Sequence, residues 1–503
     1  MKPNINVFWF KRDLRLIDNQ ALIDAVNSKT PLLLLYLFEP KLIDDNHTSK
    51  RHINFIKESI SDLNKSLKKF DTHIHVYKCE LTNFFQRLLK NYNVKSVFST
   101  DETGLDYTFQ RDKNFKVFCK ENNIKWVEHP RIGVFRARKN REKWIENWKE
   151  QMSLPIISFN PKCDDFINLE IEGVKKLILK KSKTKKFQIG GPTEAQKYLK
   201  SFLSDRYKKY HFKISKPELS RYHCSRLSAY FSWGNLSTRY VWQLAKKQVE
   251  NGKSRLHLNS FTSRLRWQSH FIQKFEMEPE MEFRSLNKGY NIKKPLNKKY
   301  LNAWKMGKTG FPLVDASMRC VIDTGYLNFR MRALLVSFLT HHLWQNWQDG
   351  VVHLAKNFLD FEPGIHYPQF QMQAGETVIN MIRIYNPVKN SFEHDPDGIF
   401  IKKWVPELKK LPINIIHEPW KINSIEEKLY KFKIGSDYPK PIVDIKETYK
   451  HASQSLWKLK ANSTVKKESL RILKKHTNAN RSASVSYTHL PSPRDKRQSR
   501  MPS

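Results

Sequence analysis

The sequence predicts an α/β domain with a Rossmann-like parallel sheet, joined by a long linker to an all-α domain. Three observations predict this. Short apolar runs alternate with amphipathic stretches as far as Arg131, strand-like alternation is scarce after Thr193, and an irregular basic segment separates the two patterns. Near-continuous apolar strands separated by helices are typical of a parallel sheet covered on both faces, and 503 residues suffice for two or three domains.

The first domain is expected over residues 1–131. Four apolar runs predict its strands, namely residues 5–10, 31–38, 73–78 and 94–99, and amphipathic stretches at 18–26 and 51–69 predict helices between them. No glycine-rich GxGxxG or Walker motif follows any of these runs. The pattern therefore predicts the sheet without naming a nucleotide ligand.

The rest of the chain is expected to form a connector, a helical domain and a tail. Residues 132–192 are irregular and basic, which predicts a surface connector. Aromatic-rich amphipathic segments predict helices from residue 193 to about 411, and a lysine-rich helical stretch continues the domain to residue 476. Residues 477–503 are expected to be disordered, and residues 484–503 resemble translated sequencing-adapter DNA, which indicates a non-native origin.

Charge is the outlying property of the composition, since 90 Lys and Arg against 49 Asp and Glu give +41. One interpretation is a lysine-rich protein with solvated side chains; the other is an anionic partner, first of all nucleic acid. The five cysteines form no CxxC pair, so neither a disulfide framework nor a metal site is predicted. Without a signal peptide or a run long enough to span a bilayer, we expect a cytoplasmic monomer that does not enter membranes.

Three segments, in this order, resemble the photolyase/cryptochrome family of light-driven flavoproteins. They are FWFKRDLRLIDNQAL (Phe8–Leu22), GKTGFPLVDASMR (Gly307–Arg319) and DFEPGIHYPQFQMQAGETVINMIRIYNP (Asp360–Pro387). The resemblance extends from the N-terminus to about Pro412. It implies an antenna-type α/β domain, a helical catalytic domain that binds FAD, and UV-damaged DNA as the partner.

A further segment, YHCSRLSAYFSWGNLSTR (Tyr222–Arg239), resembles the stretch that presents hydroxyl and amide groups to the FAD pyrophosphate in this family. The start of a helix favours an anion. The resemblance assigns cofactor binding to Cys224, Ser225, Arg226, Leu227 and Ser228, with Cys224 in place of the usual Thr, and Tyr210 is the counterpart of a phosphate-contacting tyrosine. Taken alone, the segment is better explained as an ordinary serine-capped helix, and the other motifs are what favour FAD.

Four residues are expected beside the flavin ring. The resemblance pairs Arg332 with Asp360 there, places Glu362 near the ring and ribose, and sets His366 at the N5 edge, where photolyases carry Asn. A permanently charged guanidinium favours the anionic reduced flavin. We hypothesise that His366 tunes the one-electron-reduced flavin and makes it sensitive to pH. The alternatives are a salt bridge between helices and a histidine that only packs.

The pocket for the flipped-out lesion departs from the family pattern. Trp267 matches one of the two stacking rings, but Arg264 stands in place of Glu, Gln268 in place of Arg, and Met372 in place of the second Trp. These changes weaken the case for repair of cyclobutane dimers, and Trp267 could equally pack between helices. Cationic side chains are expected to meet DNA phosphates, and Trp304 is expected to keep an aromatic ring beside the pocket; the cations are Arg264, Arg266, Arg330 and Lys308.

The electron relay of the family is also altered. Phe370 replaces the tryptophan nearest the flavin, Trp347 keeps the middle position, and Lys294 falls near the outer one. Phenylalanine is hard to oxidise, so we expect the usual relay to be interrupted. Trp344, Trp347 or Tyr326 could provide a detour.

The segment Thr100–Asp112 resembles the family's region near a second, antenna chromophore. The resemblance does not select a folate, a deazaflavin, another flavin or none.

The sequence therefore favours a divergent bacterial-type photolyase, in which reduced FAD absorbs blue light and donates an electron that splits a pyrimidine lesion. One alternative is a cryptochrome-like photoreceptor that binds FAD without repairing DNA, which the altered pocket and relay favour. Another is a basic nucleic-acid-binding protein without light chemistry, which would be colourless when purified.

Overall fold

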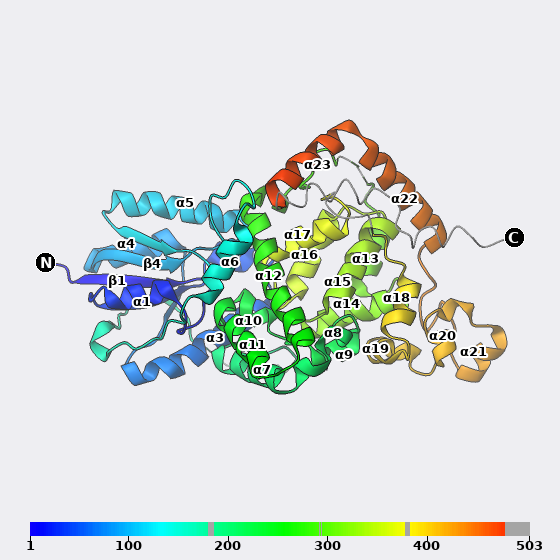
Figure 1. Cartoon of the computed structure of the whole chain (residues 1–503), viewed down its shortest axis with the longest axis horizontal. Coiled ribbons are helices and arrows are strands. Elements are labelled where there is room, and N and C mark those ends of the chain that lie inside the picture. The colour runs from blue at the N-terminus through cyan, green and yellow to red at the C-terminus, as the bar shows by residue number, and fades with distance from the viewer. Residues whose placement is uncertain (180–185, 291, 293, 378–382, 478–503) are drawn as a thin grey trace.

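The computed structural model describes residues 1–179, 186–290, 292, 294–377 and 383–477. Figure 1 shows the α/β domain at one end of an elongated molecule and the helical domain at the other, with the last two helices, α22 and α23, along one edge. The predicted tail and the middle of the predicted basic run lie outside the described residues. Within the described part, no helix is both long and apolar enough to cross a bilayer.

The sheet has the strand order β5-β4-β1-β2-β3-β6, with all neighbours parallel except the pair β3 and β6. Its strands are β1 (Asn4–Phe10), β2 (Leu32–Leu37), β3 (His75–Lys78), β4 (Asn93–Thr100), β5 (Lys125–His129) and β6 (Lys175–Lys176). The four strands predicted from apolar runs are confirmed. The sequence pattern missed β5 and β6, because β5 is only half-buried and β6 is two exposed lysines.

Helices cover both faces of this sheet, namely α1 (Gln20–Asn27), α2 (Pro40–Asp44), α3 (Lys50–Leu67), α4 (Leu81–Asn91) and α5 (Asp106–Glu121). Successive side chains of a strand point to opposite faces. Phe8 and Phe10 therefore join the core under α1 and α3, whereas Val7 and Trp9 join the core under α4 and α5. This arrangement confirms the predicted α/β class.

The connector is more ordered than its sequence predicts. It contains helix α6 (Trp144–Ser153), whose Trp144 and Trp148 are buried, and the indole N–H of Trp144 donates to Gln273 at 3.3 Å. It also returns to the sheet, where the amide of Ile167 donates to the carbonyl of Leu32 at 3.1 Å. Buried tryptophans and backbone pairing, rather than charge, decide the path of this segment.

The helical domain follows, as predicted. Its helices are α7 (Pro192–Ser204), α8 (Tyr210–Lys213), α9 (Pro217–His223), α10 (Ser228–Ser232), α11 (Thr238–Glu250), α12 (Arg255–Met277), α13 (Lys298–Met306), α14 (Pro312–Thr324), α15 (Phe329–Ser337), α16 (Gln348–Asn357), α17 (Pro363–Gln373), α18 (Pro387–His394), α19 (Ile399–Trp404), α20 (Ile413–Ile416), α21 (Ser424–Tyr430), α22 (Ile445–Ala461) and α23 (Ser463–His476). Helix α12 packs on α17, and a Cβ at Gly364 would lie only 2.9 Å from the Cα of Ile272. Glycine is needed there for the close approach.

The two domains share one continuous apolar core, which includes residues of β1, α3, α7 and α12. Polar contacts fix the segment just before α17. Nε2 of His52 donates to the carbonyl of Phe358 at 2.8 Å, and the indole N–H of Trp233 donates to the carbonyl of Leu359 at 2.9 Å. The α/β domain therefore positions the residues that lead into α17.

Buried histidines give the fold a pH dependence that can be measured. Burial lowers the pKa of several imidazoles, to about 4 for His52, His342 and His353 and to about 3 for His341 and His366. Unfolded histidine has a pKa of about 6.5. The unfolded state thus binds more protons below that pH, and the free energy of unfolding should fall as pH falls from about 6.5 towards 4. Urea unfolding at several pH values checks this.

The variant His52→Gln should make this profile shallower, because one of the titrating groups is gone. The matched change at exposed His211, His211→Gln, should leave the profile as it is. An unfolding free energy that stays constant between pH 7 and pH 5 would contradict the expectation.

Candidate active site

An arginine–carboxylate pair joins α15 to the segment before α17. Nη2 of Arg332 lies 3.0 and 2.8 Å from the two carboxylate oxygens of Asp360, and its Nε donates to the carbonyl of Leu327 at 2.8 Å. The guanidinium carbon lies 4.0 Å from the centre of the Phe358 ring. The predicted pair is thus formed, and it holds a permanent cation in a fixed orientation.

The serine-containing turn, Cys224 to Ser228, connects α9 to α10. Arg226 has a left-handed backbone, with φ of 60°, and Leu227 is fully buried. Arg206 donates to the carbonyls of Cys224 and Ser225, the latter at 3.2 Å, and so holds the turn. Helix α10 is little more than one turn long, so its end offers a smaller dipole than the sequence implies.

Tyr210 lies close to this turn in a buried aromatic cluster. Its ring meets Phe202 and Phe261 at centroid distances of 5.6 and 5.9 Å. Burial raises the pKa of its phenol, while neighbouring Arg264 acts in the opposite direction. The structure thus brings Tyr210 together with a residue of the predicted lesion pocket.

His366, on α17, is surrounded by four aromatic rings, those of Phe358, Phe361, Tyr367 and Phe370. Its Nε2 lies 2.9 Å from the carbonyl of Val351. A carbonyl only accepts, so Nε2 carries the proton and Nδ1 remains an acceptor. Burial lowers the pKa of His366 to about 3, so the imidazole is neutral at physiological pH. This low pKa disfavours pH sensitivity, which stays a prediction for the flavin-bound protein.

Glu362 is fully buried and faces the α/β domain. One carboxylate oxygen lies 2.8 Å from Nη2 of Arg131 and 3.6 Å from Nη1 of Arg12. The family resemblance places Glu362 near the ring and ribose; these partners, which come from a different domain, do not follow from it. The residue therefore ties the two domains together beside Asp360.

The predicted cofactor residues can be tested for fit by their unsatisfied atoms. Within the described residues, four buried atoms in these segments have no hydrogen-bond partner: Nε of Arg226, Oδ1 of Asn328, Nε of Arg330 and Oε1 of Glu362. Buried polar atoms are normally paired. Open donors and acceptors in these segments fit a polar ligand with phosphates and ring amide groups, as FAD has.

Helix α12 (Arg255–Met277) carries four of the residues predicted to meet the lesion or DNA. Trp267 is 41% exposed and Arg264 is also exposed, whereas Arg266 and Gln268 are half-buried. An indole that only packed between helices would not be this open. The interpretation of Trp267 as a packing residue is therefore disfavoured.

Phe329, at the start of α15, adjoins these residues. Its ring is 36% exposed, and it lies between the guanidinium groups of Arg264 at 5.2 Å and Arg330 at 5.1 Å. Met372, near the end of α17, is half-buried. The result is an open aromatic and cationic surface, to which the sequence analysis had not assigned Phe329.

Lys308 and Trp304 come from the segment that starts in α13. Lys308 is exposed, as a phosphate contact requires. Trp304 is 0% exposed, and its indole N–H donates to the carbonyl of Leu335 at 3.0 Å. The expectation that Trp304 offers a ring beside the pocket is wrong, because helices α13 and α16 enclose it in the core.

The aromatic residues proposed as electron carriers differ in their surroundings. Trp347 is buried with its ring 6.5 Å from that of Phe370. Nζ of Lys294 lies 4.6 Å from the Trp344 ring, and the guanidinium of Arg226 lies 3.7 Å from the Tyr326 ring. A nearby cation opposes the removal of an electron from a ring. Trp344 and Tyr326 are thus poor alternatives to Trp347.

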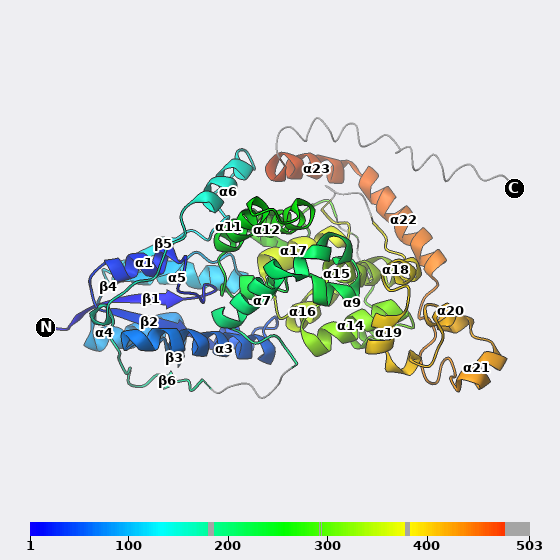
Figure 2. The same ribbon diagram turned by 60° about the horizontal axis from the view of Figure 1, so that its bottom comes forward.

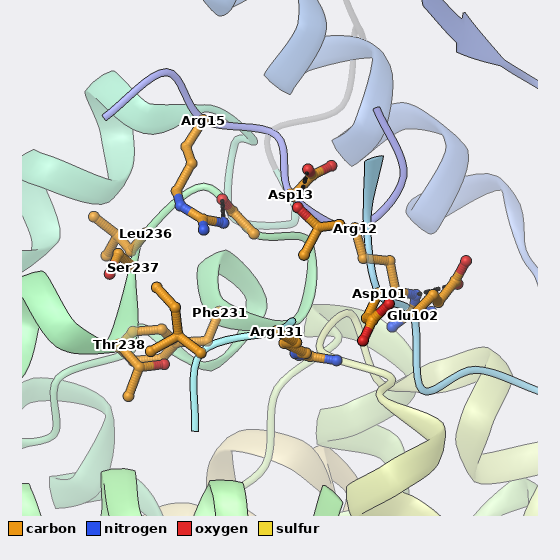
Figure 3. Close-up of a pocket in the computed structure, with 13 residues that line it drawn as sticks. Arg12, Asp13, Arg15, Asp101, Glu102, Arg131, Phe231, Leu236, Ser237 and Thr238 are labelled. Atoms are coloured by element: carbon orange, nitrogen blue, oxygen red, sulfur yellow. Dashed lines mark hydrogen bonds and ion pairs between the residues drawn. The ribbon is translucent and has the colours of Figure 1, made fainter. Parts of the chain in front are cut away.

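A polar pocket lies between the domains, where β1 and β4 end (Figure 3). Figure 3 shows Arg15, Asp13 and Arg131 around it, with Ser237 and Thr238 at the start of α11. Nearby, the carboxylate of Asp18 accepts from Nε of Arg239 at 3.1 Å. The mixture of both charge signs indicates a domain contact rather than an anion site.

A second cavity, open to solvent, lies at the carboxyl ends of β1 and β2. Its lining includes Tyr36 and Phe38 from β2 and its end, and Trp233 from the helical domain; Glu102 and Arg111 come from the segment that resembles the antenna region. The carboxyl ends of parallel strands are the usual ligand-binding edge of such sheets. The cavity is thus a candidate site for a second chromophore.

Several residues of the site gave no signal in the sequence. Arg206, Arg131 and Asn328 contribute through contacts with segments remote in the chain. Tyr367 directly follows His366 in the segment that resembles the family, so its position next to an assigned residue was the one available signal. Phe329 is part of NFRMR, where only the arginines were assigned.

Comparison with known proteins gives two family matches. Residues 6–143 match the model of DNA photolyase, and residues 261–458 match the FAD binding domain of DNA photolyase. Together these ranges cover more than half of the chain.

Individual relatives point to the same family. The chain is 30% identical to a deoxyribodipyrimidine photo-lyase of Buchnera aphidicola, over 90% of this chain and 96% of that protein. It is 25% identical to a cryptochrome DASH of Gloeobacter violaceus, over 88% of this chain and 94% of that protein.

The fold is also that of solved family members. A Synechocystis cryptochrome superimposes with a TM-score of 0.79 and 22% identity, over 90% of this chain and 99% of that one. A class III photolyase from Agrobacterium tumefaciens gives 0.79 and 22%, over 92% and 99%. With its FAD-binding domain and its two-domain architecture, the chain belongs to the photolyase/cryptochrome family.

Proposed function

We propose that this protein is a light-driven DNA repair enzyme that splits UV-induced pyrimidine lesions. The observation that carries the proposal is the exposed surface of α12 and α15, where Trp267 and Phe329 stand among the guanidinium groups of Arg264 and Arg330. Base stacking on aromatic rings and phosphate binding by cations are what an extruded nucleotide requires. The net charge of +41 supports the same partner.

Bound FAD, when reduced and excited by blue light, supplies the electron for such a repair. Arg332 would stabilise negative charge on the ring, and Asp360 would keep the guanidinium in place. Nδ1 of His366 would accept a hydrogen bond from the flavin when N5 carries a proton. The serine turn and Tyr210 would hold the pyrophosphate, with Glu362 bracing the helix start from the other domain. Trp267 would stack on the extruded base.

The cavity at the carboxyl ends of β1 and β2 would take a second, light-harvesting chromophore. A photolyase from Sulfolobus tokodaii of the same fold, at TM-score 0.72 and 24% identity, contains two FAD molecules. Aromatic walls from Tyr36, Phe38 and Trp233 suit a planar ring system. Extraction of the pigments from purified protein identifies the compound.

The test is illumination of the flavin-loaded, reduced protein with oligonucleotides that carry either a cyclobutane dimer or a (6-4) product. Restoration of one lesion in the light, and not in the dark, is the expected result. A protein that binds FAD and responds to light without restoring either lesion would be a photoreceptor like a cryptochrome. Two replacements favour that outcome: Arg264 stands in place of a pocket carboxylate, and Met372 stands in place of a stacking ring. A colourless protein would reject both functions.

The variant Trp267→Ala should weaken binding of lesion-bearing DNA by about 1–3 kcal/mol, the usual contribution of one base-stacking ring. The flavin absorption spectrum should be unchanged, because Trp267 lies at the exposed surface. The matched control is Trp457→Ala, which removes another exposed indole, 59% exposed, from α22. Equal affinities of both variants, measured by fluorescence anisotropy, would contradict the assignment.

A further inference from the structure

Three side chains form a hydrogen-bonded chain that runs from the site to the protein surface. The phenol oxygen of Tyr367 lies 2.7 Å from Nε2 of His47, and Nδ1 of His47 lies 2.7 Å from the carboxylate of Asp45. Tyr367 belongs to α17 of the helical domain, whereas His47 and Asp45 precede α3 of the α/β domain. The sequence separates them by 320 residues.

The hydrogen bonds fix the direction of proton movement along this chain. A carboxylate accepts, so Nδ1 of His47 carries the proton and Nε2 is the acceptor for the Tyr367 hydroxyl. Burial tends to raise the pKa of Asp45, but the side-chain and backbone hydrogen bonds from His47 outweigh it and the pKa is lowered. Asp45 is therefore ionised beside the imidazole. Its side chain is 27% exposed, which opens the chain to solvent.

Tyr367 also touches the aromatic residues of the altered relay. Its ring meets Trp347 at 6.0 Å, edge to face, and stacks on Phe275 at 5.7 Å. Unlike Trp344 and Tyr326, which have cations over their rings, neither Trp347 nor Tyr367 has a lysine or arginine over its ring among the described residues. Burial raises the pKa of the Tyr367 phenol, and the nearby carboxylates of Glu282 and Asp45 raise it further.

A buried phenol in this setting is hard to ionise but can be oxidised if its proton leaves at the same time. The imidazole of His47, whose Nε2 lies 2.7 Å from the phenol oxygen, provides the base for that proton. The negative environment of Asp45 favours the imidazolium that results. Trp347 provides the neighbouring ring through which an electron can leave. Each requirement of a proton-coupled electron donor is thus met by a separate contact.

We propose that Tyr367 is a redox-active tyrosine, the terminal internal electron donor of this protein, with His47 as its proton acceptor and Asp45 as the counter-ion. The inference relies on the flavin of the proposed function as electron acceptor, and it holds for repair and for signalling alike. It feeds Trp347 in place of the outer tryptophan of the relay, near which this chain has Lys294. The domain contact between α17 and the segment before α3 thereby acquires a chemical role.

In this step Tyr367 loses one electron and one proton. Trp347 gives an electron to the light-excited oxidised flavin and regains one from Tyr367. The phenolic O–H bond of Tyr367 breaks and an N–H bond forms at Nε2 of His47, which leaves a neutral tyrosyl radical and an imidazolium paired with Asp45. A small thiolate in solution then returns one electron and becomes a thiyl radical, and His47 returns the proton to the phenol oxygen of Tyr367.

The experiment follows the radical rather than repair. Purified flavin-loaded protein is illuminated with a thiol, and the rate of flavin bleaching and the electron paramagnetic resonance signal are recorded. Wild type should show a tyrosyl radical and slower bleaching in deuterated water. Tyr367→Phe should lose the radical signal, and its flavin should bleach at least about tenfold more slowly. His47→Gln should lose the slowing of bleaching in deuterated water. Tyr77→Phe, at a buried tyrosine bonded to the carbonyl of Leu169, is the matched control.

A second variant and a second assay keep the result decisive. Tyr367→Trp should restore bleaching without the tyrosyl signal, because an indole can be oxidised without His47. Repair by chemically reduced protein should be the same for wild type and Tyr367→Phe. Unchanged photobleaching and an unchanged radical in Tyr367→Phe would overturn the inference while the proposed function stands. Absence of bound flavin would instead reject the proposed function.

Discussion

Replacement of Asp360 by asparagine should weaken FAD binding by about a hundredfold, since hydrogen bonds to charged groups contribute about 1.5–3 kcal/mol each. Asp360 accepts from Arg332 with both carboxylate oxygens. Asparagine keeps the shape of the side chain but removes the charge and one acceptor. Arg332 would then lack its counter-ion and its fixed orientation. Titration of flavin-free protein with FAD, followed by fluorescence, measures the change.

The matched control is Asp323→Asn, which removes the partner of Lys186 on the surface. That pair is exposed on both sides, and exposed ion pairs contribute little. FAD affinity of this variant should equal that of wild type. If Asp360→Asn bound FAD as tightly as the control, the pair formed with Arg332 would be only a link between helices.

A second large effect is expected at the domain boundary, where Asp18→Asn should lower the free energy of unfolding by about 3–5 kcal/mol. The carboxylate of Asp18 is fully buried and pairs with Arg239 of α11. Loss of its charge leaves a buried guanidinium that cannot lose its proton. Asparagine is chosen because φ at Asp18 is 55°, a left-handed value that it tolerates.

Urea unfolding of Asp18→Asn measures this effect. Asp205→Asn is its control, since Asp205 pairs with Lys208 at an exposed site and its loss should leave the stability almost unchanged. The double change Asp18→Asn with Arg239→Met should recover most of the loss, because no unpaired charge remains. Failure to recover would mean that the backbone at Asp18, and not the charge, causes the instability.

Much of the fold could be predicted from local patterns. The strands β1 to β4 are apolar runs, and the helices α1 and α3 are amphipathic, so both follow from the spacing of apolar residues. The two lysines of β6 carry no such pattern, and their pairing with β3 depends on where the connector returns. The helix in the connector was not predicted, because the many charged residues around Trp144 and Trp148 obscure the spacing of its apolar residues.

The candidate site was predicted in part. The pairing of Arg332 with Asp360 and the exposure of Trp267 agree with the sequence analysis. The burial of Trp304 and the partners of Glu362 do not follow from any local pattern. The low pKa of His366 follows from its burial, which the residues around it in the sequence do not reveal.

The sequence by itself determined the class of each domain and the family, because periodicity and motif chemistry are local properties. Only the tertiary structure decided which groups meet. Burial and distance set the protonation of His366, place a cation over Trp344, and bring His47 to Tyr367 across 320 residues. The pKa and redox properties of a group depend on such neighbours, and folding brings these neighbours together from positions far apart in the sequence.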